Sequence, residues 1–157
     1  MHLEYFKLID RIVELNLGEK TIRAEAAVPQ VSTIFEGHFP GRPLMPGVLL
    51  IEAMAQTSGW LVIALTRFER MPFLAAVKDA KLRTFVEPGQ MLSITSSLVH
   101  DGSGFAIASA SITHAGKAVC NADITFRVMA FPDPAFRASM EQVAAEIGFP
   151  VKAAADG

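Results

Sequence analysis

One long apolar segment near the middle of the chain limits the folds that this sequence can adopt. Residues 46–67 are predicted to form a helix that begins at Pro46 and extends about 33 Å. Apolar side chains fall on nearly every face of this helix, which indicates that most of its surface is buried. The segment has the length of a membrane span, but a proline and several polar residues interrupt it: Pro46, Glu52, Gln56, Thr57 and Ser58. We therefore predict a core helix and no membrane span.

The segments before and after this helix have the alternating pattern of strands. Strands are predicted at residues 11–17, 21–28, 73–86, 91–100, 105–114 and 118–128. The last strand alternates most regularly, because every even position from Ala118 to Val128 is apolar. One apolar face per strand indicates an antiparallel sheet that packs on one side. The predicted fold class is α+β, with a curved antiparallel sheet of about six strands wrapped round the long central helix.

A second helix is predicted near the C-terminus. Asp133 can cap its first turn, Pro134 suits its first position, and Gly148 ends it. Its apolar residues share one face: Phe136, Met140, Val143, Ala144 and Ile147. Residues 3–9 are expected to form one or two helical turns, and residues 30–37 an extended segment or a loop. At 157 residues the chain is most simply one domain, because no linker divides it.

Composition argues against several classes of function. The net charge is −2, and no run of basic residues is present, so nucleic acid is not an expected partner. The single cysteine, Cys120, cannot form an internal disulfide or a cysteine-based metal cluster, and its place in a strand predicts an inert, buried thiol. Acidic residues begin at Glu4, unlike a signal peptide, and we expect a cytoplasmic protein. The 51% apolar content suggests that some surface is buried between subunits.

A single acid within the apolar helix is the first candidate for chemistry. Glu52 and Gln56 are four residues apart, so they lie on one helical face, which Gly59 and Trp60 continue. A carboxyl group shielded from water keeps its proton more readily, which is the state that a general acid needs. The Gln56 amide can hold this carboxyl group in one orientation. The alternative readings of this pattern are a buried glutamate satisfied by hydrogen bonds, with only a structural role, and a glutamate at an exposed patch of the helix.

A histidine in a turn rich in proline and glycine is the second candidate. His38 is followed by Phe39, Pro40 and Gly41, and histidine can accept a proton near neutral pH. Taken alone, His38 could equally be a loop histidine. Gly47 and Val48 then begin the central helix, where free backbone N–H groups and the helix dipole stabilise negative charge. A base, an acid and an oxyanion site so close in sequence suit proton abstraction next to a carbonyl group.

The segment HFPGRPLMPGVLLIEAMAQ, residues 38–56, resembles the active-site segment of the FabZ/FabA-type 3-hydroxyacyl-[acyl-carrier-protein] dehydratases. The resemblance extends from about residue 8 to residue 126 and implies the hotdog fold. It assigns His38 as the catalytic histidine and Glu52 as the catalytic acid, with Gln56 supporting the acid. Gly47 matches the glycine that, with the N–H of Val48, binds the thioester carbonyl. Glutamate rather than aspartate at this position implies the FabZ-like branch, which catalyses dehydration without double-bond isomerisation.

The resemblance also implies partners. In the family, the histidine and the acid of one site come from different subunits of a homodimer, and a trimer of dimers is a further possibility. The substrate is carried on the phosphopantetheine of an acidic acyl carrier protein, and no metal or redox cofactor is needed. A chain of net charge −2 would then need a local basic patch. The candidates are Arg42, Lys78, Lys81 and Arg83, although ordinary solvated charges explain them equally well.

The implied activity is that of a hydro-lyase in fatty acid biosynthesis. It converts (3R)-hydroxyacyl-[acyl-carrier-protein] to the trans-2-enoyl product, with His38 as base and Glu52 as acid. Two alternatives remain open: a hotdog acyl thioesterase that uses an acid and a water, and a non-catalytic acyl-carrier-binding subunit. We divide the chain into a hotdog dehydratase domain at 1–130, a helical extension at 131–150 and a frayed tail at 151–157. The extension exceeds the usual core and suggests a specialised member.

Overall fold

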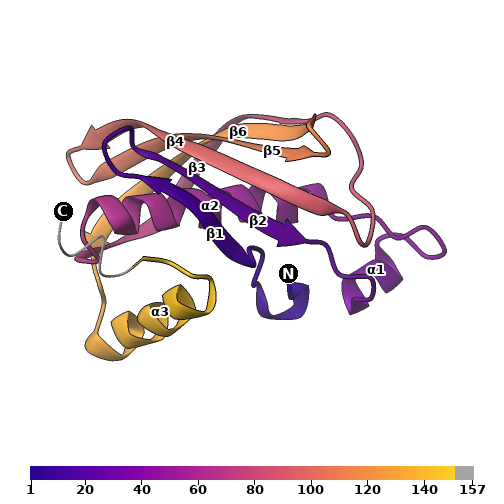
Figure 1. The fold of residues 1–157 in the computed structure, drawn as a ribbon, viewed down its shortest axis with the longest axis horizontal. Coiled ribbons are helices and arrows are strands. Elements are labelled where there is room, and N and C mark those ends of the chain that lie inside the picture. Colours follow the sequence, from indigo (N-terminus) through magenta and orange to yellow (C-terminus); the bar gives the residue numbers. More distant parts are fainter. Residues whose placement is uncertain (151–157) are drawn as a thin grey trace.

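A six-stranded antiparallel sheet lies along one side of the long helix α2 (Gly47–Leu65), and helix α3 (Pro134–Glu146) lies on the other side (Figure 1). The computed structural model describes residues 1–150, so the predicted tail at 151–157 lies outside the described residues. The strands are β1 (Arg11–Asn16), β2 (Thr21–Ala27), β3 (Arg70–Leu82), β4 (Met91–Gly102), β5 (Phe105–His114) and β6 (Lys117–Ala130). Their order across the sheet is β1-β2-β4-β5-β6-β3. The predicted α+β architecture is confirmed.

Helix α2 is the centre of the core. By length and composition it could cross a membrane, but 72% of its most apolar window is buried inside the protein, which identifies it as a core helix. The helix is shorter than predicted at both ends. Pro46 is the N-cap rather than the first helical residue, because its ψ of 131° is extended. After Leu65 the chain leaves the helix, and Arg67 and Phe68 adopt positive φ angles that a helix cannot contain.

One stripe of α2 is only partly covered by the rest of the chain. Val48 is 72% exposed, and Glu52 and Gln56 are half-buried. These residues are four positions apart and therefore follow one line along the helix. The expectation of burial on nearly every face was too broad, because the sheet can cover only part of a helix. The uncovered stripe is the part that carries the candidate acid.

The inner face of the sheet packs against α2 through small side chains. Alanines on β2 and β5 dominate this face: Ala24, Ala26, Ala106, Ala108 and Ala110. Larger aliphatic residues, such as Ile94 and Ile124, fill the remaining space. Cys120 is also buried on this face, and burial raises the pKa of its thiol to about 11. The thiol is therefore protonated at neutral pH, in agreement with the inert cysteine predicted from the sequence.

Three local predictions differ from the structure. The predicted loop at 30–37 contains a short helix, α1 (Thr33–Gly37), because the Ser32 hydroxyl caps it by accepting a hydrogen bond from Ile34 N at 3.2 Å. The strand predicted at 73–86 is β3, which begins and ends earlier because its register with β6 pairs Arg70 with Ala130 and Leu82 with Cys120. The helical turns predicted at residues 3–9 are also shorter in the structure, where only the 3₁₀ helix η1 (Leu3–Tyr5) forms.

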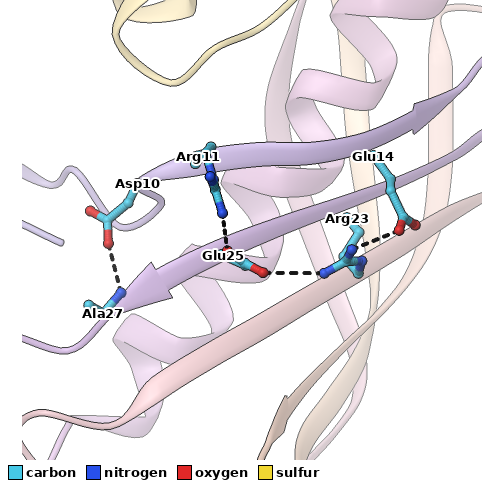
Figure 2. Close-up of polar contacts among 6 residues, drawn as sticks. All are labelled: Asp10, Arg11, Glu14, Arg23, Glu25 and Ala27. Atoms are coloured by element: carbon cyan, nitrogen blue, oxygen red, sulfur yellow. Dashed lines mark hydrogen bonds and ion pairs between the residues drawn. The ribbon is translucent and has the colours of Figure 1, made fainter.

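Charged side chains link the edge strand β1 to β2 (Figure 2). Arg11 lies opposite Glu25, and Glu14 lies opposite Arg23, with the closest N–O distance 2.7 Å in both pairs. Arg23 also reaches Glu25 at 3.5 Å. These pairs lower the pKa of Glu14 and of Glu25, chiefly through hydrogen bonds from the arginines. Such pairs stabilise little individually, but opposite charges across two strands favour this register.

Helix α3 forms close to where the sequence predicts it. The Asp133 carboxylate accepts a hydrogen bond from Phe136 N at 2.8 Å, and Pro134 is the first helical residue. The helix ends at Glu146, and Ala144 and Ile147 are buried. The boundary between a main domain at 1–130 and an extension at 131–150 stays a prediction.

Candidate active site

The turn that carries His38 is built by the Phe39-Pro40-Gly41-Arg42 sequence. The backbone of Phe39 and that of Arg42 exchange two hydrogen bonds, of 3.0 and 2.9 Å. Gly41 has a φ of 75°, which a type II turn requires at its third position, and proline is favoured at the second. The turn follows α1, whose C-cap is His38 itself. This arrangement gives His38 a fixed position between α1 and α2.

A backbone carbonyl fixes the state of the His38 ring. Nδ1 lies 2.9 Å from the carbonyl oxygen of Leu44. A carbonyl oxygen can only accept, so Nδ1 must carry the hydrogen, and the neutral ring has its free lone pair on Nε2. The ring is half-buried and stacks on Phe39, with 4.1 Å between the ring centroids. This contact leaves Nε2 as the atom of the neutral His38 ring that can accept a proton.

The start of α2 offers unpaired backbone donors. Within residues 1–150, the N–H groups of Gly47 and Val48 donate to no other group of the protein, as expected for a first helical turn. Gly47 is also a place of close approach, since a Cβ there would lie 2.4 Å from the Leu82 side chain. The two N–H groups and the helix dipole make this a site that can stabilise negative charge.

Glu52 is held by the Gln56 side chain. Gln56 Nε2 donates to Glu52 Oε1 at 3.1 Å and to the carbonyl oxygen of Phe6 at 2.8 Å, while Gln56 Oε1 accepts from Leu8 N at 3.3 Å. Because the last two partners have fixed roles, they determine the orientation of the amide. Oε1 of Glu52 therefore accepts a hydrogen bond, and within the described residues Oε2 has no protein partner. The predicted contact between Gln56 and Glu52 is present.

Glu52 opens onto a cavity of about 550 Å³. The α2 residues that line it lie on the predicted face: Glu52, Ala55, Gln56, Gly59, Trp60 and Ile63. The other walls come from the N-terminal segment, from β3 and β6, and from α3. His38 is not among the lining residues, so one chain does not bring the candidate base and acid together in this cavity.

The N-terminal segment joins the two halves of the site, which sequence reasoning missed. Besides its contacts with Gln56, it places Glu4 against the start of α1. The Glu4 carboxylate accepts hydrogen bonds from Ser32 Oγ at 2.6 Å and from Thr33 N at 2.8 Å. Residues 1–10 thus contact both the helix that precedes His38 and the side chain that holds Glu52. Nothing in the local sequence pattern could reveal these contacts, because they join segments far apart in the chain.

The Glu4 contact predicts a pH dependence of stability. Hydrogen bonds, that from Ser32 above all, lower the pKa of Glu4 from its ordinary 4.5 to about 2. A folded-state pKa below the unfolded one stabilises the fold above about pH 4.5, and this contribution disappears as the pH falls towards about 2. Glu4→Gln should therefore lower the melting temperature near neutral pH and not near pH 2, as measured by circular dichroism. Glu19→Gln, at an exposed turn, is the control. An equal effect of Glu4→Gln at both pH values would contradict this account.

The four candidate basic residues are all exposed. Arg42 lies in the His38 turn, Lys78 and Lys81 lie on β3, and the Arg83 guanidinium donates to Asn121 Oδ1 at 2.9 and 3.2 Å. Lys81 and Arg83 flank Leu82 in the chain, and so lie close to the start of α2. Their role in binding a carrier stays a prediction. In the described part of the chain, no group of three or more potential metal ligands is arranged to hold an ion.

Comparison with known proteins identifies the family. The sequence model of the FabA-like domain matches residues 1–123, which include the His38 turn, the start of α2 and Glu52. The chain belongs to the FabA-like family. The match ends within β6, so α3 follows the FabA-like domain.

Curated relatives of this FabA-like protein are named 3-hydroxyacyl-[acyl-carrier-protein] dehydratase FabZ. One from Lactiplantibacillus plantarum is 40% identical over 121 residues, which is 76% of this chain and 82% of that protein. One from Clostridium acetobutylicum is 37% identical over 123 residues, which is 78% of this chain and 86% of that protein. One from Novosphingobium aromaticivorans is 46% identical over 90 residues, which is 55% of this chain and 56% of that protein.

Solved structures confirm the hotdog fold of this FabA-like protein. A conserved protein from Pseudomonas aeruginosa has a TM-score of 0.63 and 20% identity, over 80% of this chain and 91% of that one. A hypothetical thioesterase from Streptococcus pneumoniae, solved with coenzyme A, has a TM-score of 0.59 and 17% identity, over 78% and 88% of the two chains. At these identities the likeness is one of fold alone.

Proposed function

We propose that this protein dehydrates (3R)-hydroxyacyl-[acyl-carrier-protein] to trans-2-enoyl-[acyl-carrier-protein] in fatty acid biosynthesis, as a FabZ-like hydro-lyase. The observation that carries the proposal is the carboxyl group of Glu52, which Gln56 holds through Oε1 at the wall of a cavity large enough for an acyl group. The FabZ names of the relatives and the glutamate at this position support the same activity.

In the proposed reaction, each group has one task. The N–H groups of Gly47 and Val48 hydrogen-bond to the thioester oxygen and stabilise the negative charge that develops on it. His38 Nε2 takes the proton from C2, and the electron pair of that C–H bond forms the C2–C3 double bond. The C3–O bond breaks, and Glu52 donates its proton to the leaving hydroxyl, which departs as water. Oε2 is the donor atom, because Oε1 already accepts from Gln56.

We infer that the site is shared between the two subunits of a homodimer. The cavity of one chain includes Glu52 and not His38, so a second chain would have to supply the histidine. Exposed apolar side chains lie near the site, where a partner could cover them: Val48, Leu82 and Phe85. A trimer of such dimers is compatible with this proposal.

The remaining parts of the proposal concern partners and location. The carrier protein would approach the exposed basic residues Lys81 and Arg83, which lie close to the start of α2. The reaction uses side chains and backbone groups of the protein, so no metal or redox cofactor is part of it. We propose that the protein works in the cytoplasm, where the carrier-linked substrates would be made.

Turnover of a crotonyl thioester tests the proposed function. Because the reaction is reversible, hydration of the enoyl group should be measurable as a loss of its ultraviolet absorbance, with no release of thiol. Release of free thiol, measured with a thiol reagent, would instead indicate an acyl thioesterase. A folded protein that binds acyl carrier protein and produces neither signal would be a binding subunit, and the dehydratase proposal would be wrong.

A further inference from the structure

The cavity next to Glu52 extends well beyond the reacting groups. Its α2 residues recur every three or four positions from Glu52 to Ile63, so they form one face that extends about 16 Å along the helix. Dehydration involves only C2 and C3 of the substrate, which must lie next to Glu52. The space along the rest of this face is therefore available to the remainder of the acyl chain.

Helix α3 supplies another wall of this space. Met140 and Val143 line the cavity and share one face of α3, since they are three residues apart, and the C-cap residue Ile147 continues this lining. Met140 and Val143 are half-buried: they pack against the edge of the hydrophobic core and also line the cavity. A concave wall of apolar side chains suits a hydrocarbon chain.

Contacts at both ends hold α3 in place beside the cavity. At its C-terminal end, Ile12 N donates to the carbonyl oxygen of Ile147 at 2.8 Å, and Lys7 Nζ donates to Glu146 Oε2 at 2.7 Å. Aromatic rings pack around both ends of the helix: Phe68 with Phe131, Phe73 with Phe136, and Trp60 with Phe149. These contacts attach both ends of α3 to the rest of the protein, beside the cavity.

We propose that α3 selects the acyl group, with Met140 and Val143 setting the length and width of the chain that fits the cavity. This inference rests on the proposed dehydratase function for the identity of the substrate. Because α3 follows the matched FabA-like domain at 1–123, the wall is a feature of this chain beyond that domain. The acyl group enters beside Glu52, and its far end contacts α3.

Substitution of Val143 by a larger or a smaller side chain tests the proposal. Val143→Phe fills part of the cavity, so the ratio of kcat/KM for a hexadecenoyl thioester to that for a crotonyl thioester should fall by about tenfold or more. Val143→Ala enlarges the cavity and should raise the same ratio. The measurement is hydration of crotonyl, octenoyl, dodecenoyl and hexadecenoyl thioesters of pantetheine.

Ala145→Phe is the matched control for Val143→Phe. It adds the same ring to the same helix, at an exposed position that does not line the cavity, so the ratio should stay that of the unmodified protein. An equal loss at every chain length in Val143→Phe, or the same change of ratio in Ala145→Phe, would overturn the proposal. If circular dichroism shows that Val143→Phe does not fold, Val143→Ala and Met140→Ala provide the same test by enlargement.

Fluorescence of Trp60 separates this inference from the proposed function. Trp60 is the single tryptophan of the chain and lines the cavity, so it should respond to binding of palmitoyl-coenzyme A, which cannot be dehydrated. Val143→Phe should weaken the fluorescence response to palmitoyl-coenzyme A and should not change the response to butyryl-coenzyme A, whose acyl chain is short. If Trp60 responds in this way but the protein hydrates no enoyl thioester, the proposed dehydratase function is wrong and the proposed role of α3 stands. If the protein hydrates enoyl thioesters but Val143→Phe and Val143→Ala leave the chain-length ratio unchanged, the proposed role of α3 is wrong and the dehydratase function stands.

Discussion

Glu52→Gln is expected to reduce hydration of a crotonyl thioester by about 10²–10⁴-fold, the usual contribution of a general acid. The substitution keeps the size of the side chain, and Oε1 of the new amide can still accept from Gln56. Only the transferable proton is lost. His38→Ala should cause a loss of the same order, because it removes the base. Both effects are measured as kcat/KM from the ultraviolet absorbance of the enoyl thioester.

Matched controls separate lost chemistry from lost structure. His114 Nδ1 also bonds to a backbone carbonyl oxygen, that of Met91 at 2.8 Å, but His114 lies outside the proposed site. His114→Ala should therefore keep near-normal activity, as should Glu69→Gln at an exposed position after α2. Activity close to that of the unmodified protein in Glu52→Gln or His38→Ala would refute the assigned roles. Melting temperatures measured in parallel show whether each variant keeps its fold.

A mixed dimer of the two inactive variants is expected to regain about half of the unmodified activity. If each site takes His38 from one subunit and Glu52 from the other, a dimer of His38→Ala with Glu52→Gln contains one complete site and one that lacks both groups. Co-expression of the two variants with different affinity tags, followed by purification on both tags, isolates this dimer. The measurement is kcat per dimer with a crotonyl thioester.

A reciprocal dimer supplies the control. When an unmodified subunit is paired with one that carries both substitutions, a shared site predicts almost no activity, since each site then lacks one group. A site within one chain predicts the opposite pattern, with an inactive first dimer and a half-active second one. The two dimers contain the same substitutions in total, so a general loss of stability cannot produce the predicted difference.

Much of the candidate site could be predicted from the sequence because its parts are local. The type II turn at 39–42 follows from Pro40, which fixes φ at about −65°, and from Gly41, which permits the positive φ that the next position requires. The start of α2 follows from the end of that turn, and the contact of Glu52 with Gln56 follows from helical spacing. The hydrogen bond between His38 Nδ1 and the Leu44 carbonyl oxygen could not be predicted, since it depends on the conformation of the whole segment between these two residues.

The errors occurred where distant segments meet. The start of helix α1 is held by the Ser32 cap and also by Glu4, which lies 28 residues before Ser32, and the local pattern gave no sign of the Glu4 contact. The ends of β3 depend on its pairing with β6, and the residue pattern of one strand carries no information about the register of that pairing. The N-terminal residues around Phe6 gave no sign that they contact Gln56 and line the cavity.

The sequence by itself determined the sheet, the central helix and the order of the chemical groups along the chain. These properties follow from backbone restrictions and from the periodic burial of side chains, which act over a few neighbouring residues. Only the tertiary structure decided that Glu52 opens onto a cavity without His38, and that α3 lines this cavity. Such facts depend on how separate segments pack together, and that packing follows from the shape of the whole core rather than from any local pattern.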